Sequence, residues 1–122
     1  MSARVLVVDD DPDVCETMQL VLEDAGCEVL VATDGRTTLD LLRNGAAPCL
    51  VLLDLMMPGM NGWQFLEAAR REGLLDGIPV VVVSGGRFRK QEVLALGVAG
   101  YLEKPLDFDR LIGTVREYCK GV

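Results

Sequence analysis

The chain has 122 residues, half of them apolar, and 19 acidic residues against 12 basic ones give a formal charge of −7. This length fits one domain with a substantial core, so we expect residues 1–122 to form a single domain. An acidic chain without a basic run is a poor ligand for nucleic acid, and the absence of histidine excludes Ser-His-Asp hydrolysis and most zinc sites.

The first apolar run, residues 5–8, predicts a buried strand at residues 4–8 that leads directly into the three aspartates at 9–11. A helix is expected next, because Pro12 suits a first helical turn and the following apolar residues recur at helical spacing. Asp11 would cap this helix, or alternatively serve as a third metal ligand. Gly26 is expected to end it.

Strands and helices continue to alternate along the rest of the chain. Further strands are predicted at residues 28–32, 49–53, 79–83 and, more weakly, 100–103. Helices are predicted around 39–42, at 65–69, at 91–96 and at 108–119. Such alternation predicts an α/β fold, a doubly wound five-stranded parallel sheet of the flavodoxin-like order 2-1-3-4-5 with helices on both faces.

Polar side chains follow the carboxyl ends of several predicted strands. In a doubly wound sheet the ligand site lies beyond these ends where the strand order reverses, here between the first and third strands. Those strands deliver Asp9, Asp10 and Asp54, and the fourth and fifth deliver Ser84 and Lys104. Clustered carboxylates repel one another, so a divalent cation is expected among them, and an aspartate beside such a cation can act as a nucleophile.

Four motifs occur in order along this sequence: Val-Val-Asp-Asp at 7–10, Leu-Asp-Leu-Met-Met-Pro-Gly-Met-Asn-Gly at 53–62, Ser-Gly at 84–85 and Lys-Pro at 104–105. Together they closely resemble the receiver domain of two-component response regulators. The resemblance runs from Val5 to about Tyr118 and is to the stand-alone, single-domain type.

The resemblance implies that Asp54 accepts a phosphoryl group from the phosphohistidine of a sensor histidine kinase or of a phosphotransfer protein. It implies Mg²⁺ as the metal, with Mn²⁺ as a possible substitute and no other cofactor. The ligands would be Asp9, Asp10, Asp54 and the backbone carbonyl of Met56, with Asp10 binding directly and Asp9 often through water.

The resemblance also assigns roles to the later strand ends. Ser84 would bond a phosphoryl oxygen, and Lys104 would pair with the phosphoryl group or with the Asp54 carboxylate before transfer. Tyr101 matches an aromatic switch position whose ring turns inward when Ser84 moves toward the phosphoryl group. The bond between Lys104 and Pro105 is commonly cis in this family.

The expected function is therefore a Mg²⁺-dependent phosphoacceptor that switches a surface for an unknown downstream protein, without binding nucleic acid directly. Such a domain is not an enzyme beyond its own phosphorylation and dephosphorylation. Two alternatives stay open. One is a receiver fold used as an unphosphorylated docking module. The other is a haloacid-dehalogenase-type phosphatase, suggested by Asp9-x-Asp11 after a strand, with Asp9 as nucleophile.

Cys15, Cys27, Cys49 and Cys119 are widely spaced, which indicates reduced, mostly core cysteines. No leader precedes the first strand and no apolar run approaches about 18 residues, so we expect a cytoplasmic protein without membrane insertion. The segment between Ser84 and Lys104 is short for a receiver, which predicts a trimmed loop or fourth helix. Two glycines after Ser84 further predict mobility at residues 85–90.

Overall fold

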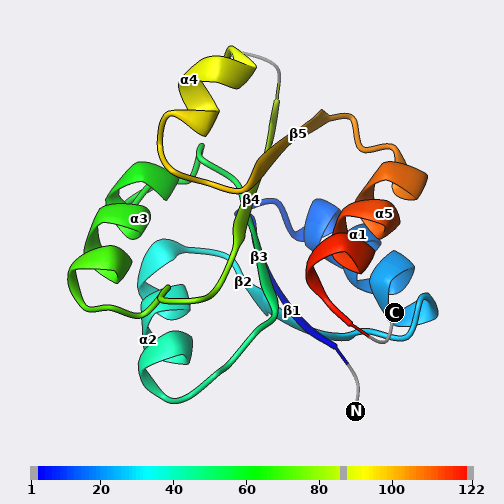
Figure 1. The fold of residues 1–122 in the computed structure, drawn as a ribbon, viewed down its shortest axis with the longest axis horizontal. Helices are drawn as coiled ribbons and strands as arrows, with labels where there is room; N and C mark the ends of the chain where they lie inside the picture. Colours follow the sequence, from blue (N-terminus) through cyan, green and yellow to red (C-terminus); the bar gives the residue numbers. More distant parts are fainter. Residues whose placement is uncertain (1–2, 86–87, 121–122) are drawn as a thin grey trace.

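A computed structural model describes residues 3–85 and 88–120, and five strands alternate in it with five helices (Figure 1). The strands are β1 (Arg4–Val8), β2 (Glu28–Ala32), β3 (Leu50–Leu53), β4 (Val80–Gly85) and β5 (Gly100–Lys104). The helices are α1 (Pro12–Asp24), α2 (Gly35–Arg43), α3 (Gly62–Arg71), α4 (Lys90–Leu94) and α5 (Phe108–Tyr118). All strand pairs are parallel and the order is β2-β1-β3-β4-β5, which confirms the predicted fold class.

The sheet separates two helical layers, with α1 and α5 on one face and α2, α3 and α4 on the other (Figure 1). Alternate strand residues supply the two cores. Leu6 and Leu53 pack toward Phe65 of α3, whereas Val7 and Leu52 pack toward Leu111 of α5. Burying each such side chain fully contributes about 1.5–3 kcal/mol, which explains why the central strands are apolar on both faces.

Side-chain caps fix where the helices begin. Asp11 accepts a hydrogen bond from the Asp13 amide at 2.9 Å, so its predicted role as the N-cap of α1 is confirmed. Asn61 and Gln64 form a reciprocal capping box at the start of α3, with hydrogen bonds of 2.9 and 3.0 Å. The loop before each of these two helices begins at a carboxyl strand end, so the caps also fix where the loops at the acidic edge finish.

The strand boundaries differ from the prediction chiefly at β4. This strand extends past its apolar run to Gly85, because Ser84 and Gly85 pair in register with Glu103 and Lys104 of β5. Residue 79 lies outside the strand, and Cys49 likewise falls just before β3. Backbone pairing with a neighbouring strand, which no apolar pattern reports, sets these ends.

The fourth helix is short, as expected, and covers five residues, Lys90–Leu94. Residues 86 and 87, which carry much of the predicted mobility at 85–90, lie outside the described part of the chain. Within the described part, no helix is both long and apolar enough to cross a membrane.

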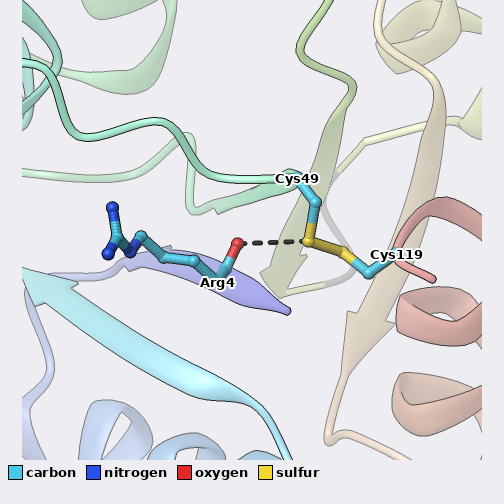
Figure 2. Close-up of a disulfide and its surroundings, with 3 residues drawn as sticks. All are labelled: Arg4, Cys49 and Cys119. Atoms are coloured by element: carbon cyan, nitrogen blue, oxygen red, sulfur yellow. Dashed lines mark hydrogen bonds between the residues drawn. A yellow bond between two sulfur atoms is a disulfide. The ribbon is translucent and has the colours of Figure 1, made fainter. Parts of the chain in front are cut away.

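The expectation of four reduced cysteines is wrong for one pair. Cys49 and Cys119 form a disulfide across 70 residues of sequence, with their Cα atoms 5.4 Å apart (Figure 2). The prediction relied on the wide spacing of the cysteines along the chain. The fold nevertheless places the end of α5 beside the beginning of β3. Cys15 and Cys27 are free and buried, as expected.

Candidate functional site

Asp54 lies at the carboxyl end of β3 and is almost completely buried. Its amide continues the sheet by donating to the Val8 carbonyl at 2.9 Å. Its Oδ1 accepts hydrogen bonds of 3.0 Å from the Met56 amide and from the Ser84 hydroxyl. Hydrogen-bond donors thus offset the cost of burying this carboxylate.

Asp9 occupies the matching position at the end of β1 and is 2% exposed. Its Oδ1 accepts from the Asp11 amide at 2.9 Å, and the Cys15 thiol donates to its backbone carbonyl at 3.2 Å. Burial raises the pKa of Asp9, although Lys104 and the Asp11 amide act in the opposite direction. Keeping the Asp9 carboxylate ionised therefore costs free energy, and a nearby cation would reduce that cost.

Lys104, at the end of β5, joins the two aspartates. Its Nζ donates to Oδ2 of Asp9 at 2.6 Å and to Oδ2 of Asp54 at 3.3 Å. Burial lowers the pKa of Lys104, but pairing with Asp9 and Asp54 outweighs that effect and leaves the pKa raised. The ammonium consequently stays charged at neutral pH.

The acidic edge has the donor chemistry of a hard-cation site. Asp9, Asp10 and Asp54 each place one carboxylate oxygen within 4.8 Å of the others, and Asp10 is exposed. Within residues 3–85 and 88–120, the three carboxylates and the ammonium of Lys104 carry a formal charge of minus two, which one divalent cation balances. Oxygen ligands in this number suit Mg²⁺, which completes its shell with water.

The loop between β3 and α3, which follows Asp54, depends on two glycines. Gly59 has a φ of 70°, a left-handed conformation that side chains rarely adopt. A Cβ added to Gly62 would lie 2.6 Å from Cα of Leu55 and 2.8 Å from the Asp54 carbonyl oxygen. The glycines of the Met-Pro-Gly-Met-Asn-Gly segment are therefore needed for a sharp turn and for close approach to the strand that bears Asp54.

The remaining predicted site residues lie nearby but with fewer contacts. Met56 is half exposed, and its amide, rather than its carbonyl, contacts Asp54. Tyr101 pairs in register with Val82 of β4, and its ring is partly buried. Among residues 3–85 and 88–120, no hydrogen-bond partner reaches its buried hydroxyl. The Lys104–Pro105 bond is cis, as expected.

The structure thus brings together Asp9, Asp10, Asp54, Ser84 and Lys104 at one edge of the sheet, as the sequence predicted. Sequence reasoning missed two groups that orient the aspartates, the amides of Asp11 and Met56. Each amide lies two residues after the aspartate it contacts, a spacing typical of Asx turns, and this signal could have revealed both.

Comparison with known proteins agrees with this geometry. The response regulator receiver domain family matches residues 5–116, nearly the whole chain. The chain therefore belongs to the response regulator receiver domain family, whose members function in two-component signal transduction by phosphotransfer.

Two longer regulatory proteins are among the similar proteins. The DNA-binding response regulator MtrA of Mycolicibacterium smegmatis is 38% identical over 118 residues, covering 95% of this chain and 50% of MtrA. The alkaline phosphatase synthesis transcriptional regulatory protein SphR of Synechococcus elongatus is 34% identical, covering 94% of this chain and 48% of SphR. The chain spans about half the length of these relatives.

Solved receiver structures show the same fold throughout. The chemotaxis protein CheY4 of Vibrio cholerae has a TM-score of 0.86 at 31% identity, over 97% of this chain and 99% of CheY4. The receiver domain of the Francisella response regulator 1452 has a TM-score of 0.85 at 31% identity, over 96% of each chain. Near-complete coverage on both sides shows that this chain and these receiver structures share one overall fold.

Proposed function

We propose that Asp54 is the phosphoacceptor and that it takes its phosphoryl group from the phosphohistidine of a sensor histidine kinase or phosphotransfer protein. A carboxylate oxygen of Asp54 attacks phosphorus, the bond from phosphorus to the histidine nitrogen breaks, and an aspartyl phosphate forms. The observation that carries this proposal is the surroundings of Asp54, whose carboxylate is buried at the switch point of the sheet among the donors of Ser84, Met56 and Lys104.

Asp9, Asp10 and Asp54 would hold Mg²⁺, with the Met56 carbonyl as a further ligand and Mn²⁺ as a substitute. When bound, the ion supplies positive charge for the phosphoryl oxygens. The residues around it have separate tasks. The Asp11 amide fixes the rotamer of Asp9, and the Met56 amide fixes that of Asp54.

Ser84 and Lys104 would bind the phosphoryl group once it is attached to Asp54. Both already contact Asp54, at 3.0 and 3.3 Å, and they lie on paired strands. A phosphoryl group adds negative charge beyond the carboxylate, so each donor can exchange its bond to Asp54 for one to a phosphoryl oxygen. A shift of Ser84 would change the position of β4 next to Tyr101 on β5. The Tyr101 hydroxyl is buried, so this ring is the candidate that transmits the change to the neighbouring surface.

The chain would then act as a cytoplasmic switch, with residues 1–122 forming one receiver domain. It would catalyse only its own phosphorylation and dephosphorylation and would signal by shifting between two conformations recognised by a downstream protein. The net charge of −7 supports a protein partner over direct contact with nucleic acid.

Incubation with Mg²⁺ and a small phosphodonor such as acetyl phosphate, followed by intact mass measurement, tests the proposal. The wild-type chain should gain one phosphoryl group and Asp54→Asn should gain none, while Asp40→Asn, on the exposed surface of α2, serves as a matched control. No adduct on wild type would favour the docking-module alternative. An adduct that survives Asp54→Asn but disappears in Asp9→Asn would favour the phosphatase alternative.

A further inference from the structure

The disulfide joins two segments at the edge of the sheet opposite the acidic site. Cys49 immediately precedes β3 and Cys119 immediately follows α5 (Figure 2). The strand that starts beside Cys49 ends beside Asp54, so the two sites lie at opposite ends of β3. The bond attaches the last turn of α5 to the central strand without contacting the carboxylates.

We infer that Cys49 and Cys119 form a reversible oxidation site that takes a peroxide as oxidant and a dithiol as reductant. The two sulfurs differ in access, because Cys49 is partly exposed whereas Cys119 is 2% exposed. Peroxide would therefore meet Cys49 first, and the neighbouring Cys119 would complete the bond.

The chemistry balances without any further reactant. The Cys49 thiolate attacks one peroxide oxygen, the O–O bond breaks, and a sulfenic acid and one water result. The Cys119 thiolate then attacks the Cys49 sulfur and displaces the hydroxyl group as a second water once protonated. Two thiols and one hydrogen peroxide thus give one disulfide and two waters. A dithiol reverses the bond by exchange and is itself oxidised to a disulfide.

The fold can also accommodate Cys49 and Cys119 in their reduced form. Cys49 Sγ lies 3.1 Å from the Arg4 carbonyl oxygen, so a reduced Cys49 thiol would have an acceptor already in place (Figure 2). The end of α5 keeps two noncovalent contacts, from the Cys119 amide to the Val115 carbonyl at 2.7 Å and from the Tyr118 hydroxyl to the Ala99 carbonyl at 3.3 Å. Reduction therefore loosens the end of α5 without removing its packing.

The other two cysteines are poor competitors for oxidant. Both are buried, and burial raises the pKa of the Cys27 thiol. A protonated, buried thiol reacts slowly with peroxide. In a cytoplasm, where thiols are kept reduced, the Cys49–Cys119 bond would then mark oxidative conditions, a meaning that rests on the proposed location.

The test uses the full chain, reduced with dithiothreitol, desalted and treated with hydrogen peroxide, after which the chain is unfolded, thiols are blocked with N-ethylmaleimide and peptides are mapped. We expect two labelled cysteines instead of four, a Cys49–Cys119 cross-linked peptide, and a Tm about 10 °C higher than in the reduced chain. Renewed dithiothreitol should restore four labels. Cys119→Ala should abolish the cross-link, and Cys27→Ala, at a buried position outside the pair, should leave it intact.

Four labels after peroxide, a cross-link to Cys15 or Cys27, or a bond that dithiothreitol does not open in the folded chain would each overturn the inference. The wild-type peptide map is sufficient for this decision even if an alanine variant fails to fold. Phosphorylation of Asp54 plays no part in the readout, so failure here and failure of the proposed function are distinguishable.

Discussion

The ammonium of Lys104 lies 2.6 Å from Oδ2 of Asp9, nearer than the 3.3 Å that separates it from Oδ2 of Asp54. Without a metal, the lysine therefore partly neutralises the aspartate of β1 rather than serving Asp54 alone. Asp10 adds a third, exposed carboxylate, so the ammonium of Lys104 alone does not balance the charge of the three carboxylates.

Mg²⁺ should stabilise the folded chain, because a cation that binds only the folded state shifts the unfolding equilibrium. At a concentration 100 times its Kd, the ion should add about 2.7 kcal/mol to the free energy of unfolding. Thermal denaturation with and without Mg²⁺ measures this change. Asp10→Asn should lose most of it, while Asp24→Asn, at the far end of α1, should keep it. Equal Mg²⁺ responses in both variants would remove Asp10 from the ligand set.

Asp9→Asn should raise the free energy of unfolding at neutral pH in the absence of metal. Burial raises the pKa of Asp9, so the folded state holds this proton more tightly than the unfolded chain does. The resulting stabilisation is present below the ordinary aspartate pKa of about 3.9 and is lost as the pH rises through the folded-state value. Asparagine imitates the protonated form at every pH.

Urea unfolding at several pH values checks the sign of the Asp9→Asn effect. The free energy of unfolding of Asp9→Asn should exceed that of wild type by the largest amount near neutral pH. This difference should shrink as the pH falls toward about 4. A wild type that is the more stable protein at neutral pH without metal would show that the Lys104 pair outweighs the burial of Asp9.

Ser84→Ala should slow phosphoryl transfer to Asp54 while leaving the fold intact. The hydroxyl donates to Asp54 at 3.0 Å from a fully buried position and would pass to a phosphoryl oxygen during transfer, where a hydrogen bond to a charged group contributes about 1.5–3 kcal/mol. The rate of adduct formation from a small phosphodonor should fall roughly 10- to 100-fold. Ser84→Thr keeps the hydroxyl and should retain more of the rate. Equal rates in all three proteins would remove the hydroxyl from the mechanism.

Gly62→Ala should destabilise the chain by about 1–3 kcal/mol, because the added methyl would meet the backbone of Leu55 and Asp54. Gly113→Ala is the matched control. Gly113 lies inside α5, where an added Cβ meets nothing within 4 Å, so this change should stabilise by about 0.5–1 kcal/mol. Urea unfolding compares the two, and effects of the same sign would contradict the close approach at Gly62.

The sequence carried enough information for the fold and for most of the acidic edge. Buried strands such as β3 are read from continuous apolar runs, and parallel topology forces their polar ends to one edge, so Asp54 and Asp9 could be placed together in advance. The apolar run predicts a strand that ends at residue 83, whereas β4 includes Ser84, because the pairing of Ser84 with Glu103 leaves no trace in hydrophobicity.

The contacts that could not be predicted are those between residues far apart in the chain. Nothing in the spacing of Cys49 and Cys119 indicates that α5 returns to the start of β3. Nor does the sequence reveal that Lys104 favours Asp9, since that choice depends on a difference of less than 1 Å between two ion pairs. Patterns predict which elements form and which edge is polar, whereas pairings within that edge depend on side-chain geometry.

Locating the phosphoryl group by peptide mapping tests the central claim most directly. After incubation with acetyl phosphate and Mg²⁺, borohydride reduces an aspartyl phosphate to homoserine, which marks the modified residue in the digested chain. We predict homoserine at position 54 and at no other aspartate. Homoserine at position 9, or a stable phosphate on Ser84 with position 54 unmodified, would contradict the account.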